Sequence, residues 1–229
     1  MKKRFLLSVA VLMSLWLGAS GQSYDWAKLN RYAKANEQLQ ASGEAEGKTV
    51  LIGNSITDFW PNLRPEFFAE NDLIGRGIGG QTSYQFLVRF REDVVNLRPE
   101  TVVINVATND IAENNYPYDE SRTMGNIMTM VEVAEANGIK VILTSVLPAD
   151  EFPWRKEIKD AAGKVKSLNR AIELYAKIKG IPYVDYYSVM VNPETGGMRD
   201  GLSRDGIHPT AEGYAIMEET LLPVLKKLH

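Results

Sequence analysis

Residues 101–106 read Thr-Val-Val-Ile-Asn-Val, and their apolar core shows no polar alternation. The run is too short for a full helix, and a continuous apolar run suits a strand that is covered on both faces, as in a parallel sheet. Runs of similar character stand on either side of it in the chain, at residues 49–53, 73–78, 139–146 and 181–185. The sequence therefore predicts five short, buried strands.

Longer amphipathic stretches separate these runs, and their apolar residues recur at the three- and four-residue intervals of one helix face. Strand alternating with helix implies parallel pairing through crossovers, and hence a central sheet with helices on both faces. Before the first strand, Trp26, Leu29 and Ala33 predict a surface helix over residues 24–40. Near the end of the chain, Pro223 predicts a kink in the last helix.

The composition is that of one globular domain: 229 residues, 45% of them hydrophobic and 24% charged. The sequence contains no Cys, which excludes disulfides, thiol nucleophiles and zinc sites built on thiolates. The formal net charge of −3 argues against a nucleic-acid partner. Of the two histidines, only His208 is internal, so an imidazole mechanism has one candidate.

The first 21 residues have the three-part pattern of a secretory signal peptide. A basic Lys2-Lys3-Arg4 region precedes an apolar run to about Ala19, and small residues end at Gly21, which predicts cleavage before Gln22. The alternative is an uncleaved anchor, but the run is shorter than the roughly 20 residues that span a bilayer. We expect an exported protein, periplasmic or secreted, with one domain over residues 22–229 and no stable membrane anchor. Its oligomeric state is left open.

Removal of residues 1–21 takes away three basic groups and no acidic group. The mature chain then carries 23 Lys plus Arg against 29 Asp plus Glu, a formal charge of −6. This acidic balance strengthens the case against nucleic acid.

Candidate functional residues follow the predicted strands, because ligands bind at the carboxyl ends of such sheets. Ser55, in the sequence Gly-Asn-Ser-Ile over residues 53–56, is placed to project its hydroxyl, although a cap serine is common there. Gly80 lies in a glycine-rich turn before a helix, which either presents amide N–H groups to an anion or only closes a tight turn. Asn109 follows the third strand and either aims its amide at a reacting oxygen or makes a local turn.

Asp205 and His208 stand in a turn before the last helix, in the sequence Asp-Gly-Ile-His-Pro. A carboxylate three residues before an imidazole can hydrogen-bond Nδ1 and leave Nε2 free to take a proton. The alternative is a capping Asp and a surface His. Two potential ligands with no further His or Cys rarely hold a transition metal, so neither a metal nor another cofactor is expected. Together the four segments supply a nucleophile, a base, an orienting acid and oxyanion donors.

These four segments resemble, in order, the sequence blocks of the SGNH hydrolases, the GDSL family of esterases and lipases. The resemblance spans residues 50–214 and is most specific at Asp205 and His208, which lead into Pro-Thr-Ala-Glu-Gly-Tyr. It implies a flavodoxin-like three-layer α/β/α fold with a five-stranded parallel sheet. It also implies metal-free ester hydrolysis by Ser55, His208 and Asp205, with the oxyanion held by the Ser55 and Gly80 N–H groups and the Asn109 amide.

The chain departs from the family pattern at two places. Asn54 replaces the Asp of the G-D-S block, and Ala107-Thr108 replaces the glycine that usually precedes the Asn block. Ala and Thr restrict the backbone more than Gly does, so the placement of Asn109 is open to question.

The loops after the last three predicted strands are rich in aromatic and amide side chains, which suit either sugar recognition or simple packing. Expected substrate contacts are Asn54, Tyr116, Asp150 and Trp154. Because the sequence shows no long apolar lid, we expect short esters, first of all acetyl groups on carbohydrates. Two alternatives stay open: a lysophospholipase or thioesterase with the same catalytic residues, and an inactive glycan-binding relative.

Overall fold

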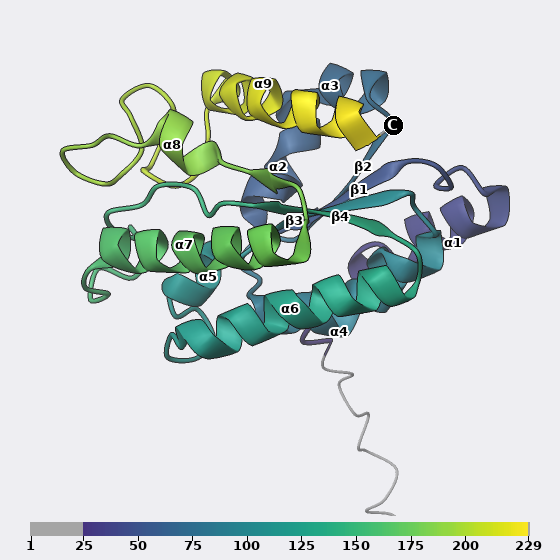
Figure 1. The fold of residues 1–229 in the computed structure, drawn as a ribbon, viewed down its shortest axis with the longest axis horizontal. Coiled ribbons are helices and arrows are strands. Elements are labelled where there is room, and N and C mark those ends of the chain that lie inside the picture. The colour runs from purple at the N-terminus through teal and green to yellow at the C-terminus, as the bar shows by residue number, and fades with distance from the viewer. Residues whose placement is uncertain (1–24, 229) are drawn as a thin grey trace, which may run out of the picture.

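A computed structural model describes residues 25–228 of the chain and contains a five-stranded parallel sheet (Figure 1). The strand order is β2-β1-β3-β4-β5, and every neighbouring pair is parallel. The strands are β1 (Thr49–Gly53), β2 (Leu73–Gly77), β3 (Thr101–Asn105), β4 (Lys140–Thr144) and β5 (Tyr183–Val184). This is the flavodoxin-like order of a doubly wound sheet. The predicted fold class is confirmed.

Helices cover both faces of the sheet (Figure 1). One layer consists of α2 (Ser55–Leu63), α3 (Pro65–Glu70), α8 (Tyr186–Met190) and α9 (Ala211–Leu228). The opposite layer contains α1 (Ala33–Ser42), α4 (Ser83–Asp93), α6 (Glu120–Ala136) and α7 (Ala161–Lys179). Short elements complete the chain: the 3-10 turns η1 (Leu29–Arg31) and η2 (Val95–Leu97), and the helix α5 (Thr108–Ile111).

The apolar side chains of the strands pack into two hydrophobic cores, one on each face of the sheet. Successive side chains of a strand point to opposite faces. Accordingly, Val103 and Ile142 belong to the core under α2, α8 and α9, whereas Val102, Ile104 and Val141 belong to the core under α4, α6 and α7. All of these side chains are buried. The strand sequences therefore lack polar alternation because both faces of the sheet are buried, as predicted.

The N-terminal region differs from the helix predicted over residues 24–40. Its first described residues form the turn η1, and α1 begins only at Ala33. Leu29 is 39% exposed and Ala33 is exposed, so the predicted apolar face is not the buried one. The buried residue of α1 is instead Asn36, because this segment is held by polar contacts.

Two other expectations concern the ends of the chain. Pro223 lies inside α9, which continues to Leu228. The predicted signal peptide over residues 1–21 lies outside the described residues. Within residues 25–228, no helix combines the length and the apolar character that crossing a membrane requires.

The strand order brings the carboxyl ends of β1, β2 and β3 together. β1 lies between the other two, with Gly53 paired to Gly77 on one side and to Asn105 on the other. The segments that follow these three strands therefore leave the sheet side by side. They are the segments that contain Ser55, Gly80 and Asn109.

Candidate active site

Ser55 is the first residue of α2, directly after β1. Asn54 is the N-cap: its non-helical backbone ends the strand, and its Oδ1 accepts a hydrogen bond from the Ile56 N–H at 3.1 Å. The side chain of Asn54 is 1% exposed, so the structure makes it a helix cap and not the substrate contact expected from the sequence. The replacement of Asp by Asn at this position keeps a capping oxygen.

Gly53 allows α2 to start immediately beside the sheet. A Cβ at this position would lie 1.9 Å from Thr57 Oγ1 and 3.1 Å from the Asn105 carbonyl oxygen. Only a glycine leaves room for the first turn of α2 at its observed distance. Close packing of this turn therefore sets the height of Ser55 above the sheet.

His208 meets Ser55 across 153 residues of sequence. The Ser55 Oγ lies 2.9 Å from His208 Nε2, and His208 Nδ1 lies 2.7 Å from Asp205 Oδ2. The other carboxylate oxygen of Asp205 accepts the backbone N–H groups of Ile207 at 3.0 Å and His208 at 2.8 Å. A hydroxyl, an imidazole and a carboxylate thus form one hydrogen-bonded chain.

The carboxylate of Asp205 is the ionised end of this chain. Burial alone would raise the pKa of Asp205, but hydrogen bonds from the His208 backbone and ring, with that of Ile207, hold this pKa below its usual value. An ionised carboxylate at Nδ1 favours the tautomer that presents an unprotonated Nε2 to Ser55.

Gly80 follows β2 and has a left-handed backbone with φ of +80°. A Cβ there would meet no atom within 4 Å, so the requirement for glycine is conformational. The neighbouring Gly79 N–H donates to Asp58 Oδ2 at 3.2 Å. Within residues 25–228, the backbone N–H groups of Ser55 and Gly80 have no acceptor.

Asn109 and Asp110 follow β3 in α5 and point to different partners. Asn109 Nδ2 donates to the Gln81 carbonyl at 2.9 Å, which leaves its second hydrogen for another acceptor. Asp110 accepts the Ser83 backbone N–H at 3.0 Å and the Ser83 hydroxyl at 2.5 Å, at the start of α4. Burial raises the pKa of Asp110 to about 6, against the lowering effect of the hydrogen bonds from Ser83.

The backbone before Asn109 adopts the conformation that glycine favours. Ala107 has φ of +90° and is the N-cap of α5. A non-glycine residue in this region costs about 1–2 kcal/mol. Despite this strain, the backbone places Asn109 in the lining of the same cavity as Ser55 and Gly80.

A cavity of about 290 Å³ opens at this place, lined by Ser55, Gly80, Asn109, Asn114, Trp154 and His208. Trp154 Nε1 donates to Asn114 Oδ1 at 2.8 Å, and Asn114 Nδ2 donates to the Gly80 carbonyl at 3.3 Å. These two bonds connect the loop after β4 to the glycine turn. They close one side of the cavity.

Two aromatic rings flank His208. The ring centroid of Trp154 lies 6.4 Å and that of Phe59 lies 5.3 Å from the centroid of the imidazole. Both rings reach solvent, with Trp154 42% and Phe59 43% exposed. Sequence reasoning missed Phe59, yet a signal was present, because a residue four positions after Ser55 shares its helix face.

The other expected substrate contacts lie elsewhere. The Tyr116 hydroxyl is hydrogen-bonded to Thr82 Oγ1 at 2.8 Å, and its ring packs on Tyr84 with centroids 4.3 Å apart. Asp150 is exposed and stands beside Gly197. Neither side chain lines the cavity at Ser55, so of the four expected contacts only Trp154 does.

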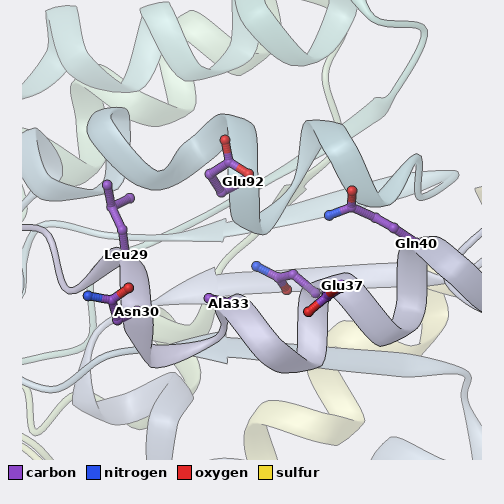
Figure 2. Close-up of a pocket in the computed structure, with 7 residues that line it drawn as sticks. Leu29, Asn30, Ala33, Glu37, Gln40 and Glu92 are labelled. Carbon is purple, nitrogen blue, oxygen red and sulfur yellow. The ribbon is translucent and has the colours of Figure 1, made fainter.

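A larger cavity of about 500 Å³ lies between α1 and α4 and shares no lining residue with the cavity at Ser55 (Figure 2). Its lining consists of Leu29, Asn30, Ala33, Asn36, Glu37, Gln40 and Glu92. This set contains no hydroxyl nucleophile and no imidazole. The volume of a cavity therefore does not identify the candidate active site. The chemistry of the side chains that line the cavity does.

Comparison with known proteins gives the family. The model of the GDSL-like Lipase/Acylhydrolase family matches residues 51–216. A GDSL-like lipase from Bacteroides thetaiotaomicron is 53% identical, with a TM-score of 0.86 over 90% of this chain and 100% of that one. The uncharacterized lipoprotein YqeF of Bacillus subtilis is 34% identical over 172 residues, 65% of this chain and 71% of that protein.

A more distant relative has a defined activity in its name. The acetylxylan esterase of Xylanibacter ruminicola is 24% identical over 226 residues, which cover 83% of this chain and 45% of that protein. The matches in sequence and in structure agree with the resemblance drawn from the four sequence blocks. This chain belongs to the GDSL-like lipase/acylhydrolase family and is a carboxylic ester hydrolase.

Proposed function

We propose that this protein is a serine esterase that removes short acyl groups, first of all acetyl groups, from carbohydrates. The observation that carries the proposal is the chain of contacts from Ser55 Oγ to His208 Nε2 at 2.9 Å and from His208 Nδ1 to Asp205 at 2.7 Å. This geometry beside a cavity is what a nucleophilic serine needs.

In the proposed reaction, His208 takes the proton of Ser55 as Oγ attacks the ester carbonyl. The imidazolium gives that proton to the departing alcohol, and an acyl-enzyme remains on Ser55. Water then enters, loses a proton to His208 and attacks the acyl carbon. The acid is released, and the proton returns to Ser55.

The negative oxygen formed in each step needs donors. We assign the backbone N–H groups of Ser55 and Gly80 and the second Nδ2 hydrogen of Asn109 to this role, because these residues line the same cavity and both backbone groups lack an acceptor within residues 25–228. Loss of one such donor raises the barrier by about 3–4 kcal/mol.

The size of the cavity supports a short acyl group. Its volume is about 290 Å³, and the hydrogen-bonded pair of Trp154 and Asn114 closes one side of it. A long acyl chain that extends toward this pair would have to displace it. The acetyl group, with two carbons, is among the smallest acyl groups and needs no such displacement.

The carbohydrate part of the proposal rests on the two exposed rings beside His208. Phe59 and Trp154 offer apolar faces next to the position of the leaving alcohol, and rings of this kind suit the face of a sugar. The acetylxylan esterase of Xylanibacter ruminicola supports the same direction. We further propose one domain over residues 22–229, exported after cleavage before Gln22 to a periplasm or the medium. The printed sequence holds no Cys for attachment of a lipid.

The test is acetate release from an aryl acetate and from a panel of acetylated polysaccharides. The wild-type protein should hydrolyse both, whereas Ser55→Ala and His208→Ala should lose the activity. Ser121→Ala, at an exposed position in the first turn of α6, is the matched control and should retain it. Turnover that survives in Ser55→Ala would overturn the mechanism.

Two further assays separate the alternatives. A series of aryl esters from acetyl to octanoyl should show a rate that falls with chain length, and a rate that rises would indicate a lipid or thioester substrate. A fluorophosphonate should label Ser55 covalently. Absence of both labelling and turnover would indicate a glycan-binding protein without catalysis.

A further inference from the structure

The N-terminal arm, defined here as residues 25–42, lies outside the residues that the family model matches. Only Ala27 and Asn36 of this arm are buried. Its attachment to the domain is largely polar, and the polar contacts converge on the turn after β2. This turn, residues 77–82, is called the glycine loop below because it contains Gly77, Gly79 and Gly80.

Three side chains join the arm to the glycine loop and to the helix after it. Gln81 Nε2 donates to the Ala27 carbonyl at 2.7 Å, and Gln85 Nε2 donates to the Trp26 carbonyl at 2.8 Å. In the opposite direction, the Tyr32 hydroxyl donates to the Gly77 carbonyl at 2.5 Å. The arm therefore holds both ends of the turn that contains Gly80.

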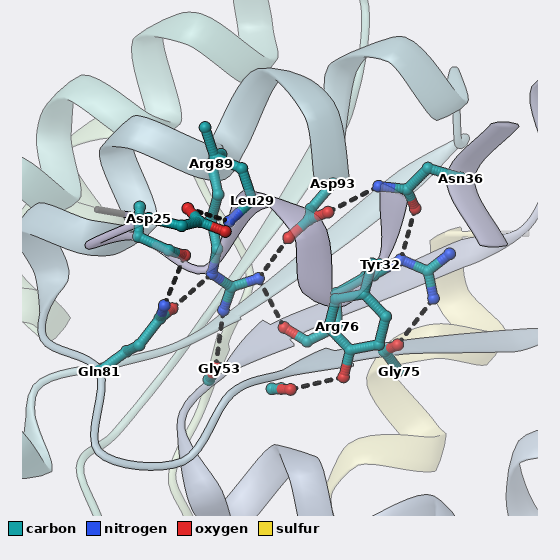
Figure 3. Close-up of polar contacts among 12 residues, drawn as sticks. Asp25, Leu29, Tyr32, Asn36, Gly53, Gly75, Arg76, Gln81, Arg89 and Asp93 are labelled. Atoms are coloured by element: carbon teal, nitrogen blue, oxygen red, sulfur yellow. Dashed lines mark hydrogen bonds and ion pairs between the residues drawn. The ribbon is translucent and has the colours of Figure 1, made fainter. Parts of the chain in front are cut away.

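Arg89 connects these contacts to the nucleophile segment (Figure 3). Its side chain is 0% exposed, and its Nε donates to Gln81 Oε1 at 2.6 Å. Its Nη1 donates to Asp93 at 2.8 Å and to the Arg76 carbonyl at 2.9 Å. Its Nη2 donates to the Gly53 carbonyl at 2.9 Å, two residues before Ser55.

A second contact joins the far end of the arm to the same network. Asn36 Nδ2 donates to Asp93 Oδ1 at 2.7 Å, and Asn36 Oδ1 accepts from Arg76 Nε at 2.9 Å (Figure 3). The carboxylate of Asp93 is thus shared between Arg89 and the arm. One buried ion pair links the arm, the glycine loop and the end of β1.

Burial of a guanidinium and a carboxylate away from water is costly, so a pair like this is weak as a source of stability. The pair contributes orientation instead, because the planar guanidinium of Arg89 holds several hydrogen-bond acceptors in fixed positions. Here the acceptors are the carbonyl groups of Gly53 and Arg76 and the side chain of Gln81. They flank the two loops that carry Ser55 and Gly80.

We propose that the N-terminal arm is a positioning element of the active site, which acts through Gln81 and Arg89 to hold the Gly80 N–H beside Ser55. This inference rests on the proposed esterase function. Gly79 and Gly80 have no side chains that could pack, so hydrogen bonds set the position of this loop. The bonds from the arm add to those that the loop makes with Asp58, Asn109 and Asn114. A misplacement of about 1 Å at a reacting centre can cost about 100-fold in rate.

The test is the double variant Gln81→Glu/Gln85→Glu. Each Glu keeps the oxygen that accepts from Arg89 or from the Thr82 N–H, but neither can donate to the Ala27 or Trp26 carbonyl. We expect kcat for an aryl acetate to fall by about 10-fold or more while KM changes less than about threefold. Fluorophosphonate labelling of Ser55 should slow in parallel, because it uses the same oxyanion donors.

The matched control is Gln38→Glu, which makes the same chemical change at an exposed position of α1 that does not line the cavity between α1 and α4. It should behave as the wild type. Backbone amide exchange over residues 77–82 should quicken in the Gln81/Gln85 variant and not in the control. This readout needs no activity, so it tests the inference even if the wild-type protein fails to hydrolyse esters and the proposed function is lost.

A milder variant guards against misfolding. Tyr32→Phe removes only the hydroxyl that bonds to the Gly77 carbonyl, and it should lower kcat in the same direction with a smaller effect. If both variants fold, keep the wild-type kcat and show unchanged exchange over residues 77–82, the arm does not position the glycine loop. If the double variant does not fold, Tyr32→Phe decides by the same two measurements.

Discussion

Replacement of Gly53 by Ala should separate the position of Ser55 from its chemistry. The new Cβ would lie 1.9 Å from Thr57 Oγ1, and ordinary van der Waals contact begins at 3.4 Å. Rotation of the Thr57 side chain can remove Oγ1, but Thr57 Cβ would still lie 2.5 Å from the new atom, so the first turn of α2 or the end of β1 must move by about 0.9 Å to reach ordinary contact. Ser55 is part of that turn and should move with it.

Two magnitudes follow from this displacement. Overpacking of this kind lowers the free energy of unfolding by about 1–3 kcal/mol. A movement of about 1 Å at the nucleophile should also lower kcat by about 100-fold, because the hydrogen bond from Ser55 Oγ to His208 Nε2 depends on the position of Ser55.

The assay is urea unfolding together with aryl acetate hydrolysis at a temperature where the variant is folded. Gly125→Ala is the matched control: Gly125 is exposed within α6, and an added Cβ would meet nothing within 4 Å. It should keep the activity and gain up to about 1 kcal/mol of stability. If Gly53→Ala keeps kcat within about threefold of the wild type, the close packing of α2 does not set the position of Ser55.

Three further predictions follow from the site. Asp205→Asn should lower kcat by about 10³–10⁴-fold with little change in KM, because the amide no longer selects the His208 tautomer that leaves Nε2 unprotonated. Steady-state kinetics would measure this loss, and a decrease in kcat of less than about tenfold would contradict the role of Asp205 in orienting His208. Trp154→Ala should raise the hydrolysis of butyryl relative to acetyl esters, since Asn114 loses the partner with which it closes the cavity; an unchanged ratio in competition assays would contradict a steric role. The free energy of unfolding should decrease as the pH rises through about 6, because burial raises the pKa of Asp110 to about 6 in the folded state, well above the ordinary pKa of an aspartate side chain. The stability that this group contributes is full below the unfolded pKa, and its loss by neutral pH amounts to at most about 3 kcal/mol. Urea titrations between pH 4 and 7 should show this loss as the difference between wild type and Asp110→Asn, and identical pH dependence in the two proteins would contradict it.

Much of the fold could be predicted because the burial of strand and helix faces produces recognisable apolar patterns in the local sequence. The run at residues 101–106 lacks polar alternation because Val103 faces one core and Val102 and Ile104 face the other. The sequence predicts the N-terminal helix too early because the opposite holds there. That segment is held by side-chain hydrogen bonds such as that of Asn36 to Asp93, and hydrophobic periodicity carries no signal for them.

The candidate site divides in the same way. Asp205 and His208 are three residues apart, so one turn suffices to join them, and their pairing is visible in the sequence. Asn54, Tyr116 and Asp150 were expected to touch substrate because of their residue types. Asn54 instead caps α2 and Tyr116 bonds to Thr82, since each of these side chains found a partner that only the folded chain supplies.

The alternation of strands and helices and the four segments with polar side chains follow from the amino-acid order alone, because spacing along the chain reports which faces are buried and which turns are tight. Which of these segments meet depends on the folded chain. Ser55 and His208 are 153 residues apart, and the 2.9 Å between Oγ and Nε2 depends on the order of the strands, on the room left by Gly53 and on the packing of both helical layers. The link from the N-terminal arm through Arg89 to Gly53 was decided in the same way, because a buried guanidinium finds its acceptors in space and not in sequence.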